Sequence, residues 1–403
     1  MTVTVKKGKA VGTVSAPPSK SVAHRLLICS ALSGGSTVRN VAFSKDIEAT
    51  LSCLCSLGAS VEVTGSTVKL CGLDPKCAKP SEPLFCNESG STLRFMLPLC
   101  LLSEGEITLK GTEKLLSRPL GIYEDICKAR GISYRKTADF VTVGGTLASG
   151  EYIVRGDVSS QFITGLMFAL PLLEGDSKII ISGRFESESY VDITLYVLSL
   201  FGVNIVKNGN VFYIKGGQEY KSRELTVEGD CSNAAFLDAF SLLGGEVTLT
   251  GISPDTLQGD RVYKEMFAAL KNGQREFDLS DCPDLAPVMF ALSAHLGGAH
   301  FVGTERLKIK ESDRGAAMAE ELAKFGATLT IGENEISVSG NALHAPNARL
   351  CGHNDHRIVM ALTLLCSAFG GEITGAEAVS KSFPDFFSKI KSLGIGIEQN
   401  DTE

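Results

Sequence analysis

The chain has 403 residues, of which 44% are hydrophobic and 21% charged, and its formal net charge is −7. This composition excludes a largely disordered chain, and the excess of acidic groups disfavours binding to duplex nucleic acid. No apolar run approaches the roughly 18–20 residues of a membrane span, and the N-terminus does not look like a secretion signal, so we expect a cytoplasmic protein.

A chain of this length is expected to form two domains, since single domains usually have about 100–200 residues. Its twelve cysteines are scattered, and none belongs to a C-x-x-C pair. Most of them lie in apolar surroundings, so we expect reduced, buried thiols.

One pattern recurs six times along the chain. Each copy has an apolar, helix-like stretch, a turn that contains glycine, and a short alternating strand, as in LLICSALSGGSTV near the N-terminus. The turn glycines are Gly35, Gly105, Gly175, Gly245, Gly298 and Gly371. Their intervals of 70, 70, 70, 53 and 73 residues predict six structural repeats, one of which is shortened.

A second pattern alternates with the first. Here a helix-like stretch ends at a single glycine, which suits the left-handed cap of a helix, and a segment that alternates with period two follows. These glycines are Gly58, Gly131, Gly202, Gly273, Gly326 and Gly394. Each copy is therefore predicted to contain two helices and several strands.

Six copies divide naturally into two domains of three, with a crossover near residues 227–230. The strand expected at residues 2–6 precedes the first copy and could pair with the last one, which would make the second domain discontinuous. The first helix of each copy is apolar on nearly all sides, and such a helix is expected to be buried. The sequence therefore predicts an α/β protein with buried helices surrounded by sheet.

Positive side chains gather where these buried helices are expected to begin. Polar residues at the same places, among them Ser91, Ser232 and Asn233, can cap free N–H groups. Capping does not explain the cations, because they oppose the positive end of the helix dipole. An anion such as a phosphate or a carboxylate would explain them. The cations are Lys20, Arg25, Arg94, His356 and Arg357.

A second group of polar residues follows the strands after the glycine turns. It comprises Arg118 and the segments 187–190, 310–314 and 381–385. His353 and His356 form an H-x-x-H pattern, but no third ligand is suggested, so we expect no metal site. No glycine-rich nucleotide loop is present either.

The motifs SKS, SGSTLR, SRP, SSQF, PD, KESDR, NDHR and KSFPD occur in this order along the whole chain. In combination they resemble the 5-enolpyruvylshikimate-3-phosphate synthase family, also called 3-phosphoshikimate 1-carboxyvinyltransferase. The resemblance implies the enolpyruvyl transferase fold, an inside-out α/β barrel with two similar domains, each of three βαβαββ units. The expected domains are 16–227, on the shikimate-3-phosphate side, and 1–15 with 228–403, which would carry the catalytic carboxylates and the phosphoenolpyruvate-binding arginines.

The resemblance also implies a reaction. The enolpyruvyl (carboxyvinyl) group of phosphoenolpyruvate would pass to the 5-hydroxyl of shikimate-3-phosphate, with release of phosphate through a tetrahedral intermediate. This step belongs to the shikimate pathway, which leads through chorismate to aromatic amino acids. The resemblance implies a monomer that acts on these two small molecules and needs no metal or organic cofactor.

The functional residues of the family match positions of this chain one by one. By similarity, Asp284 would accept the hydroxyl proton and Glu311 would protonate the methylene carbon. The sequence leaves open how Lys20, Lys310 and Glu311 divide the proton transfers. The residues implied for shikimate-3-phosphate are Lys20, Ser21, Arg25, Ser159, Ser160, Gln161, Ser187, Asp284 and Lys310. Those implied for phosphoenolpyruvate are Lys20, Gly90, Arg118, Gln161, Arg314, Arg357 and Lys381. Taken by itself, Asp284 after Pro283 could also be a helix cap.

Two positions depart from the family pattern and are left out of these sets: Glu88, which could pair with Arg94, and Arg306. A UDP-N-acetylglucosamine enolpyruvyl transferase is the nearest alternative, but it would be expected to carry a reactive loop cysteine and a different first motif. A DNA sliding clamp is the alternative outside enzymes. A clamp would spread its cations along helices, whereas here they cluster at helix starts and loops.

Overall fold

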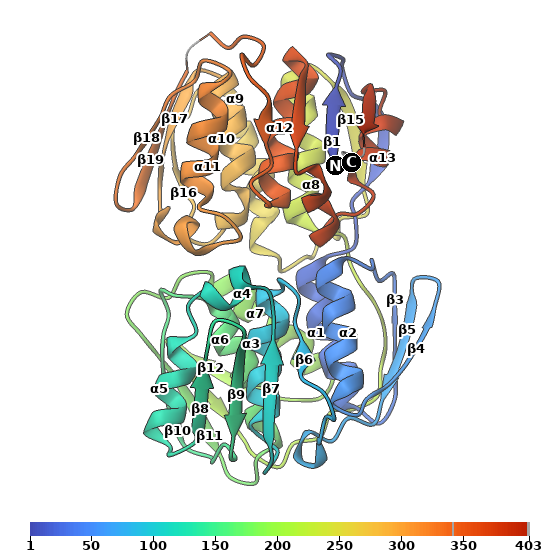
Figure 1. The fold of residues 1–403 in the computed structure, drawn as a ribbon, viewed down its shortest axis with the longest axis vertical. Helices are drawn as coiled ribbons and strands as arrows, with labels where there is room; N and C mark the ends of the chain where they lie inside the picture. Colours follow the sequence, from blue (N-terminus) through green and yellow to red (C-terminus); the bar gives the residue numbers. More distant parts are fainter. Residues whose placement is uncertain (341, 401–403) are drawn as a thin grey trace. The chain divides into compact units, whose positions relative to one another are not determined.

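The computed structural model describes residues 1–340 and 342–400, and the chain folds into two compact units (Figure 1). We call Pro18–Glu228 the continuous unit. The other unit joins Met1–Pro17 to Gly229–Glu403, and we call it the split unit.

Three buried helices form the core of the continuous unit. Each begins after a serine, at 19, 89 or 159, whose hydroxyl accepts a hydrogen bond from an N–H of the first turn and so ends the preceding loop. These helices are α1 (Lys20–Leu32), α3 (Gly90–Cys100) and α6 (Ser160–Ala169). The second helices of the three copies are α2 (Lys45–Ser56), α5 (Gly121–Ala129) and α7 (Glu188–Leu200).

Each repeat of the continuous unit has one buried helix and one four-stranded sheet, and the three sheets share the same topology. In each sheet the first two strands are parallel and the other two pairings are antiparallel. A buried helix, α3 or α6, connects the parallel strands in two of the sheets, whereas in the sheet next to α1 the first strand comes from the end of the unit. In sheet order the strands are β14 (Glu224–Thr226), β3 (Ser36–Arg39), β5 (Thr67–Cys71) and β4 (Ser60–Thr64); β6 (Leu84–Phe85), β7 (Glu106–Lys110), β9 (Phe140–Gly144) and β8 (Ser133–Lys136); β10 (Glu151–Arg155), β11 (Ser177–Ser182), β13 (Val211–Ile214) and β12 (Ile205–Asn208).

The split unit repeats the same arrangement (Figure 1). Its buried helices are α8 (Cys231–Asp238), α10 (Ala286–His295) and α12 (His356–Phe369), and its second helices are α9 (Tyr263–Lys271), α11 (Arg314–Ala323) and α13 (Phe386–Ser392). Its sheets are β16 (Glu276–Asp278), β17 (Gly298–Val302), β19 (Glu335–Ser339) and β18 (Leu329–Ile331); β20 (Leu350–Cys351), β21 (Gly371–Thr374), β1 (Thr2–Val5) and β22 (Ile397–Asn400); and the pair β15 (Glu246–Thr250) and β2 (Val11–Ser15).

Short helices complete the two units. They are α4 (Glu113–Ser117) and the 3-10 turns η1 (Pro75–Cys77), η2 (Leu170–Leu172), η3 (Ala239–Leu243), η4 (Gly259–Val262), η5 (Pro283–Leu285), η6 (Glu305–Ile309) and η7 (Ala376–Lys381).

The N-terminal strand pairs with the last copy, as predicted. Strand β1 lies between β21 and β22 and is antiparallel to both. It takes the place that the last strand of the hairpin holds in the other four-stranded sheets, and its Val3 and Val5 are buried. The next strand, β2, lies parallel to β15 and serves as the first strand of the fourth copy.

The fourth copy is the shortened one. Its sheet consists of β15 and β2 alone among the described strands, so the two antiparallel strands that complete each of the other sheets have no counterpart there. The prediction that the strand after Gly273 belongs to the fourth copy is wrong. Residues 276–278 instead form β16, the first strand of the fifth copy.

The prediction that the first helices are buried is confirmed. In α1, for example, Leu27, Ile28 and Cys29 have no exposed surface. All twelve cysteines are free thiols, and eight of them are buried, while Cys55 and Cys77 are exposed. No helix within residues 1–340 and 342–400 combines the length and apolar character needed to cross a membrane.

Candidate functional site

Three of the predicted residues of the split unit meet at Asp284, in η5 just before α10. Its Oδ1 lies 2.8 Å from Nη1 of Arg314, the first residue of α11, and 3.5 Å from Nζ of Lys310. Its Oδ2 lies 2.9 Å from Nη2 of Arg357, in the first turn of α12. The starts of α11 and α12, from two successive repeats, thus converge on a carboxylate just before α10.

The cations around Asp284 determine its ionisation. Burial would raise the pKa of the Asp284 carboxyl, but Arg357, Lys310 and Arg314 outweigh it and hold the pKa well below its usual range. Asp284 lies inside η5 rather than at its N-cap, which is Cys282. The alternative of a helix-capping role is therefore wrong.

A second carboxylate, Asp355, links α11 to α12. Its Oδ1 caps α12 by accepting from the backbone N–H of Arg357 at 2.9 Å. Its Oδ2 accepts from Nε of Arg314 at 2.9 Å and from the hydroxyl of Ser312 at 3.1 Å. An Asp just before the helix in the NDHR motif is a usable sequence signal for this cap.

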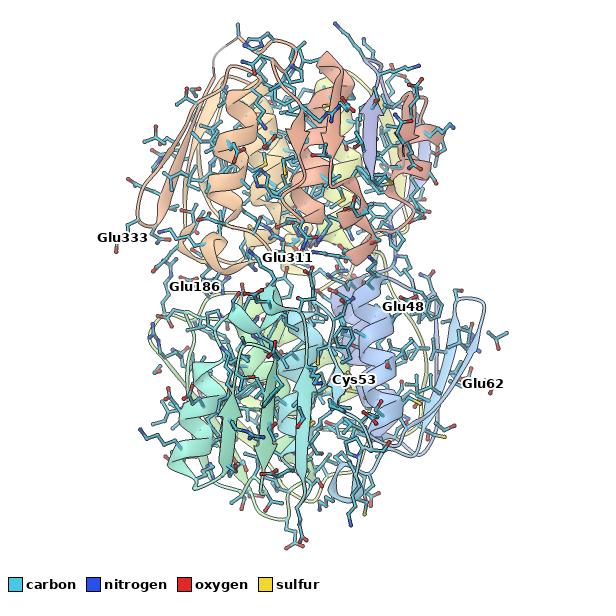
Figure 2. The ribbon with its side chains drawn as sticks, in the orientation of Figure 1. Glu48, Cys53, Glu62, Glu186, Glu311 and Glu333 are labelled. Carbon is cyan, nitrogen blue, oxygen red and sulfur yellow. The ribbon has the colours of Figure 1, made fainter. Side chains whose placement is uncertain are left out.

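The other two predicted residues of the split unit also lie next to the α12 start. Glu311, labelled in Figure 2, places Oε2 2.8 Å from Nδ1 of the buried His356. Nζ of Lys381 donates to the backbone carbonyl of Asn354 at 2.6 Å. The split unit therefore brings all of its predicted site residues to the N-terminal ends of α11 and α12 and to η5.

The H-x-x-H pattern does not form one site. His356 contacts Glu311, whereas Nε2 of His353 lies 2.9 Å from Oε1 of Glu321. Each histidine belongs to a group of three residues spaced closely enough for a metal ion. In each group, however, a carboxylate already holds a cation, Arg314 on Asp355 and Lys324 on Glu321.

In the continuous unit, Lys20 is the first residue of α1 and pairs with Asp46 of α2 at 2.8 Å. Arg25 lies one turn further on and is 2% exposed. Its guanidinium donates to the backbone carbonyl of Ser21 at 2.7 Å, to the hydroxyl of Thr194 at 2.8 Å and to the carbonyl of Tyr190 at 2.9 Å. Burial lowers the pKa of Arg25 to about 10. The guanidinium therefore joins α1 to α7.

Gly90 and Arg118 touch each other. Gly90 is the first residue of α3, and Arg118 follows α4. A Cβ atom at position 90 would lie 2.7 Å from Nη1 of Arg118, which is closer than such atoms approach. Glycine is therefore needed for Arg118 to lie against this helix start.

The start of α6 carries a hydrogen-bonded network. Ser159 caps this helix, and the side chain of Gln161 donates to Ser91 at 2.9 Å and accepts from Nη1 of Arg94 at 2.6 Å. Burial and the charge of Arg118 lower the pKa of Arg94 to about 9. Arg94 was considered as a partner of Glu88 in the sequence, but its hydrogen bonds go to Gln161 and the carbonyl of Pro119.

The remaining predicted residues lie at the same ends of their helices. Ser160 is the buried first residue of α6, and Ser187 is the buried residue before α7, with a left-handed φ of 54°. The predicted caps Ser91, Ser232 and Asn233 are wrong by two or three residues. The observed caps are Ser89 and Asp230, because capping needs an extended backbone just before the helix.

Arg306 and Glu88 are the two positions that were left out of the assigned sets. Arg306 is buried in η6 and donates to the carbonyl of Ser280 at 3.3 Å. Glu88 is half-buried in the loop immediately before Ser89.

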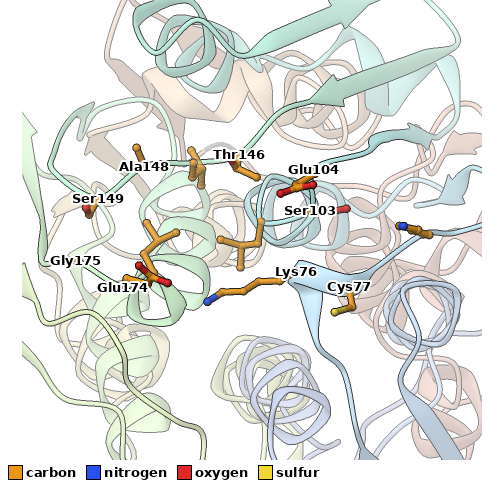
Figure 3. Close-up of a pocket in the computed structure, with 13 residues that line it drawn as sticks. Lys76, Cys77, Ser103, Glu104, Thr146, Ala148, Ser149, Glu174 and Gly175 are labelled. Atoms are coloured by element: carbon orange, nitrogen blue, oxygen red, sulfur yellow. The ribbon is translucent and has the colours of Figure 1, made fainter.

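The continuous unit also contains a cavity of about 630 Å³, lined by residues of 76–79, 102–104, 146–149 and 173–175 (Figure 3). Residues 102–104 and 173–175 follow α3 and η2, so the cavity lies at the opposite ends of these buried helices from Gly90 and Ser160. It shares no residue with the predicted site.

Comparisons with known proteins identify relatives along the whole chain. The family model for EPSP synthase (3-phosphoshikimate 1-carboxyvinyltransferase) matches residues 5–390. A protein of that enzyme name from Clostridium kluyveri is 42% identical over 420 residues, covering 98% of each chain. Another from Clostridioides difficile is 38% identical over 423 residues, covering 97% of each chain. The solved EPSP synthase from Acinetobacter baumannii superposes with a TM-score of 0.79 at 21% identity, over 99% of this chain and 100% of that one.

Proposed function

The chain belongs to the EPSP synthase family and has the enolpyruvyl transferase fold expected from its sequence, and we propose that it transfers the enolpyruvyl group of phosphoenolpyruvate to the 5-hydroxyl of shikimate-3-phosphate. It is an enzyme of the shikimate pathway to aromatic amino acids. The alternative acceptor, a UDP-N-acetylglucosamine, is not favoured, because the relatives carry the shikimate enzyme's name. The observation that best supports the chemistry is a carboxylate, Asp284, held between two arginines.

Phosphoenolpyruvate brings a carboxylate and a phosphate, and we assign its carboxylate to Arg314 and Arg357. Their Nη atoms already hold both oxygens of one carboxylate, that of Asp284. Guanidinium groups suit this planar recognition. The other residues assigned to phosphoenolpyruvate are Lys20, Gly90, Arg118, Gln161 and Lys381.

Shikimate-3-phosphate is assigned mainly to the continuous unit. The free N–H groups and the positive dipole at the starts of α1 and α6 suit a phosphate. The residues assigned to this substrate are Lys20, Ser21, Arg25, Ser159, Ser160, Gln161 and Ser187, with Asp284 and Lys310 of the split unit.

Asp284 acts as the general base in this proposal, although its pKa is held well below the usual range. Such a weakly basic carboxylate is a poor proton acceptor. The carboxylate of phosphoenolpyruvate would compete with Asp284 for Arg314 and Arg357. Losing these partners would raise the basicity of Asp284 when both substrates are bound.

The proton balance then closes over two steps. The 5-hydroxyl oxygen attacks C2 of phosphoenolpyruvate, Asp284 takes the hydroxyl proton, and Glu311 supplies a proton to the methylene carbon. When the tetrahedral intermediate breaks down, the C–O bond to phosphate breaks, the phosphate leaves with the proton held by Asp284, and one methyl proton returns to Glu311, which restores the double bond. We assign these proton transfers jointly to Glu311, Lys20 and Lys310, and His356 contacts the Glu311 carboxylate at 2.8 Å.

We further propose that the enzyme is a cytoplasmic monomer that needs no metal or organic cofactor. The single chain carries both sets of assigned residues. Its free thiols suit a reducing compartment.

Phosphate release tests the reaction directly. Purified protein is mixed with phosphoenolpyruvate and, in separate reactions, shikimate-3-phosphate, unphosphorylated shikimate, UDP-N-acetylglucosamine or no acceptor. Release should be rapid only with shikimate-3-phosphate. Release with the UDP-sugar and none with the shikimate ester would refute the proposal.

A further inference from the structure

The loop between β20 and α12 has an unusual backbone. His353 and Asn354 are consecutive non-glycine residues with left-handed φ values of 47° and 52°. L-amino acids avoid this region, and a side chain other than glycine stays there only when its surroundings hold it. The loop leads directly into Asp355, which caps α12.

A fully buried carboxylate on α11 holds this loop at two points. Oε2 of Glu321 accepts from the backbone N–H of Cys351 at 2.9 Å, and its Oε1 lies 2.9 Å from Nε2 of His353. Nζ of Lys324 lies 2.9 Å from both oxygens and balances the buried charge. Glu321 thus ties the loop to the helix that begins with Arg314.

The held loop presents a backbone carbonyl to a candidate substrate-binding lysine. Nζ of Lys381 donates to the carbonyl oxygen of Asn354 at 2.6 Å. A rotation of the backbone at position 353 or 354 would turn this carbonyl away. The position of the Lys381 ammonium therefore depends on the left-handed conformation of the loop.

We propose that His353 and Glu321 are positioning residues: the hydrogen bond from His353 to Glu321 holds the loop so that the Asn354 carbonyl orients Lys381 for phosphoenolpyruvate. This inference rests on the proposed function and deepens it. Neither residue touches the substrate in this account, and both act through the backbone of the loop.

The electrostatics fit a charge-assisted hydrogen bond. The hydrogen bond to Glu321 raises the pKa of His353, and burial and the positive charge of Lys324 oppose this effect. Burial would raise the pKa of Glu321, but its hydrogen bonds with His353, Lys324 and Cys351 lower it. Glu320, whose Oε2 lies 3.9 Å from Nε2 of His353, adds negative charge on the same side. Both shifts favour the charged forms, in which this hydrogen bond is strongest.

Two substitutions at position 353 test the hydrogen bond to Glu321 separately from the preference of the residue for the left-handed backbone conformation. His353→Asn keeps a residue that tolerates the left-handed region, but its shorter side chain cannot reach Glu321. His353→Gln places an amide N–H near the position of Nε2. His300→Asn is the matched control, because His300 faces Glu335 at 3.6 Å on the surface of the same unit.

Steady-state kinetics of phosphate release provide the first readout. His353→Asn should raise the KM for phosphoenolpyruvate roughly tenfold, the effect of losing one charge-assisted hydrogen bond that orders a binding group. Turnover and the KM for shikimate-3-phosphate should stay within about twofold. His353→Gln should recover most of the loss, and His300→Asn should match the wild type. An unchanged KM in His353→Asn, an equal rise for both substrates, or a His353→Gln as poor as His353→Asn would overturn the inference.

Amide hydrogen exchange tests the loop without relying on the reaction. Exchange of the peptide covering residues 350–357 should be faster in His353→Asn than in the wild type or in His353→Gln. Unchanged exchange would overturn the inference even if the enzyme is active. A wild type that releases no phosphate with shikimate-3-phosphate would instead refute the proposed function, and the exchange result would still decide whether His353 holds the loop.

Discussion

At the scale of single residues, the central feature is a carboxylate that its neighbours keep ionised. Asp284 is surrounded by Arg314, Arg357 and Lys310 within the split unit. Removing it would leave these cations facing one another. The residue neutralises part of their charge, in addition to the role as general base that we propose for it.

We expect Asp284→Ala to lower turnover by about 10² or more, the usual contribution of a positioned general base. Binding of both substrates, measured by titration calorimetry, should change much less. Asp281→Ala serves as the control, since Asp281 is an exposed carboxylate three residues away. Turnover near the wild-type value in Asp284→Ala would place the base elsewhere.

Gly90 provides a second prediction at this scale. In Gly90→Ala the new methyl group must displace the Arg118 guanidinium, because only 2.7 Å separates it from Nη1. We expect the KM for phosphoenolpyruvate to rise roughly tenfold, since small misplacements of a binding group are costly.

Gly121→Ala is the matched control for Gly90→Ala. Gly121 also begins a helix of the continuous unit, α5, and a Cβ there would meet nothing within 4 Å. Its kinetics should match those of the wild type. A Gly90→Ala enzyme with an unaltered KM would show that Arg118 does not bind phosphoenolpyruvate.

At the scale of elements, the candidate site residues lie close to the N-terminal ends of the helices. Each first helix is mostly apolar, and its charged side chains lie mainly in the first two turns. Five of these helices are capped by the side chains of Ser19, Ser89, Ser159, Asp230 and Asp355. The caps and first turns of these helices hold half of the candidate substrate-binding residues.

The double role of Asp355 gives a stability prediction. Asp355→Asn keeps an oxygen that can cap α12 but removes the charge that faces Arg314, which is 2% exposed. Breaking a buried ion pair costs about 3 kcal/mol or more. We expect the free energy of unfolding, measured with denaturant at pH 7, to fall by about this amount. Asp313→Asn should have little effect, since Asp313 caps α11 at the surface.

The ion pair between Asp355 and Arg314 also predicts how the stability difference between the wild type and Asp355→Asn depends on pH. Burial would raise the pKa of Asp355, but Arg314 lowers it below the ordinary value. The ionised carboxylate therefore stabilises the fold above its unfolded pKa of about 3.9, and this contribution is lost as the pH falls through the lower folded value. The stability gap between wild type and Asp355→Asn should narrow below about pH 4. A gap that persists in strong acid would contradict the ionic explanation.

At the scale of the whole molecule, the repeats exchange strands along the chain. The first copy takes β14 from the end of the continuous unit, and the fourth and sixth copies take β2 and β1 from the N-terminus. Every sheet except that of the fourth copy thereby reaches four strands. The continuous unit contains all of its own strands, whereas the split unit needs residues from both ends of the chain.

This difference predicts unequal behaviour of fragments. A fragment of residues 18–228 should fold alone and give a cooperative unfolding transition. A fragment of residues 229–403 should not, because β21 and β22 would both lose β1 and each would expose an unpaired edge. Adding residues 1–17 through a short linker should restore folding, as circular dichroism would show. A stable 229–403 fragment would contradict this account of the split unit.

Periodicity and spacing by themselves determined the six copies, the buried helices and the pairing of residues 2–6 with the last copy. These are local patterns of apolar residues and glycines, and burial of apolar surface acts on them wherever they occur. The clustering of cations at helix starts could also be predicted from the sequence, because positive side chains at the positive end of a helix dipole are unfavourable and here they recur in several copies.

Only the tertiary structure decided which groups meet. The pairing of Lys20 with Asp46, of Arg314 with Asp355 and of His353 with Glu321 joins residues 26, 41 and 32 positions apart on different elements. Sequence separation carries no information on such contacts, since they depend on how the repeats pack. The missing strands of the fourth copy could not be predicted for the same reason. Residues 276–278 have the alternating pattern of a strand of the fourth copy, and only their pairing with β17 assigns them to the sheet of the fifth copy.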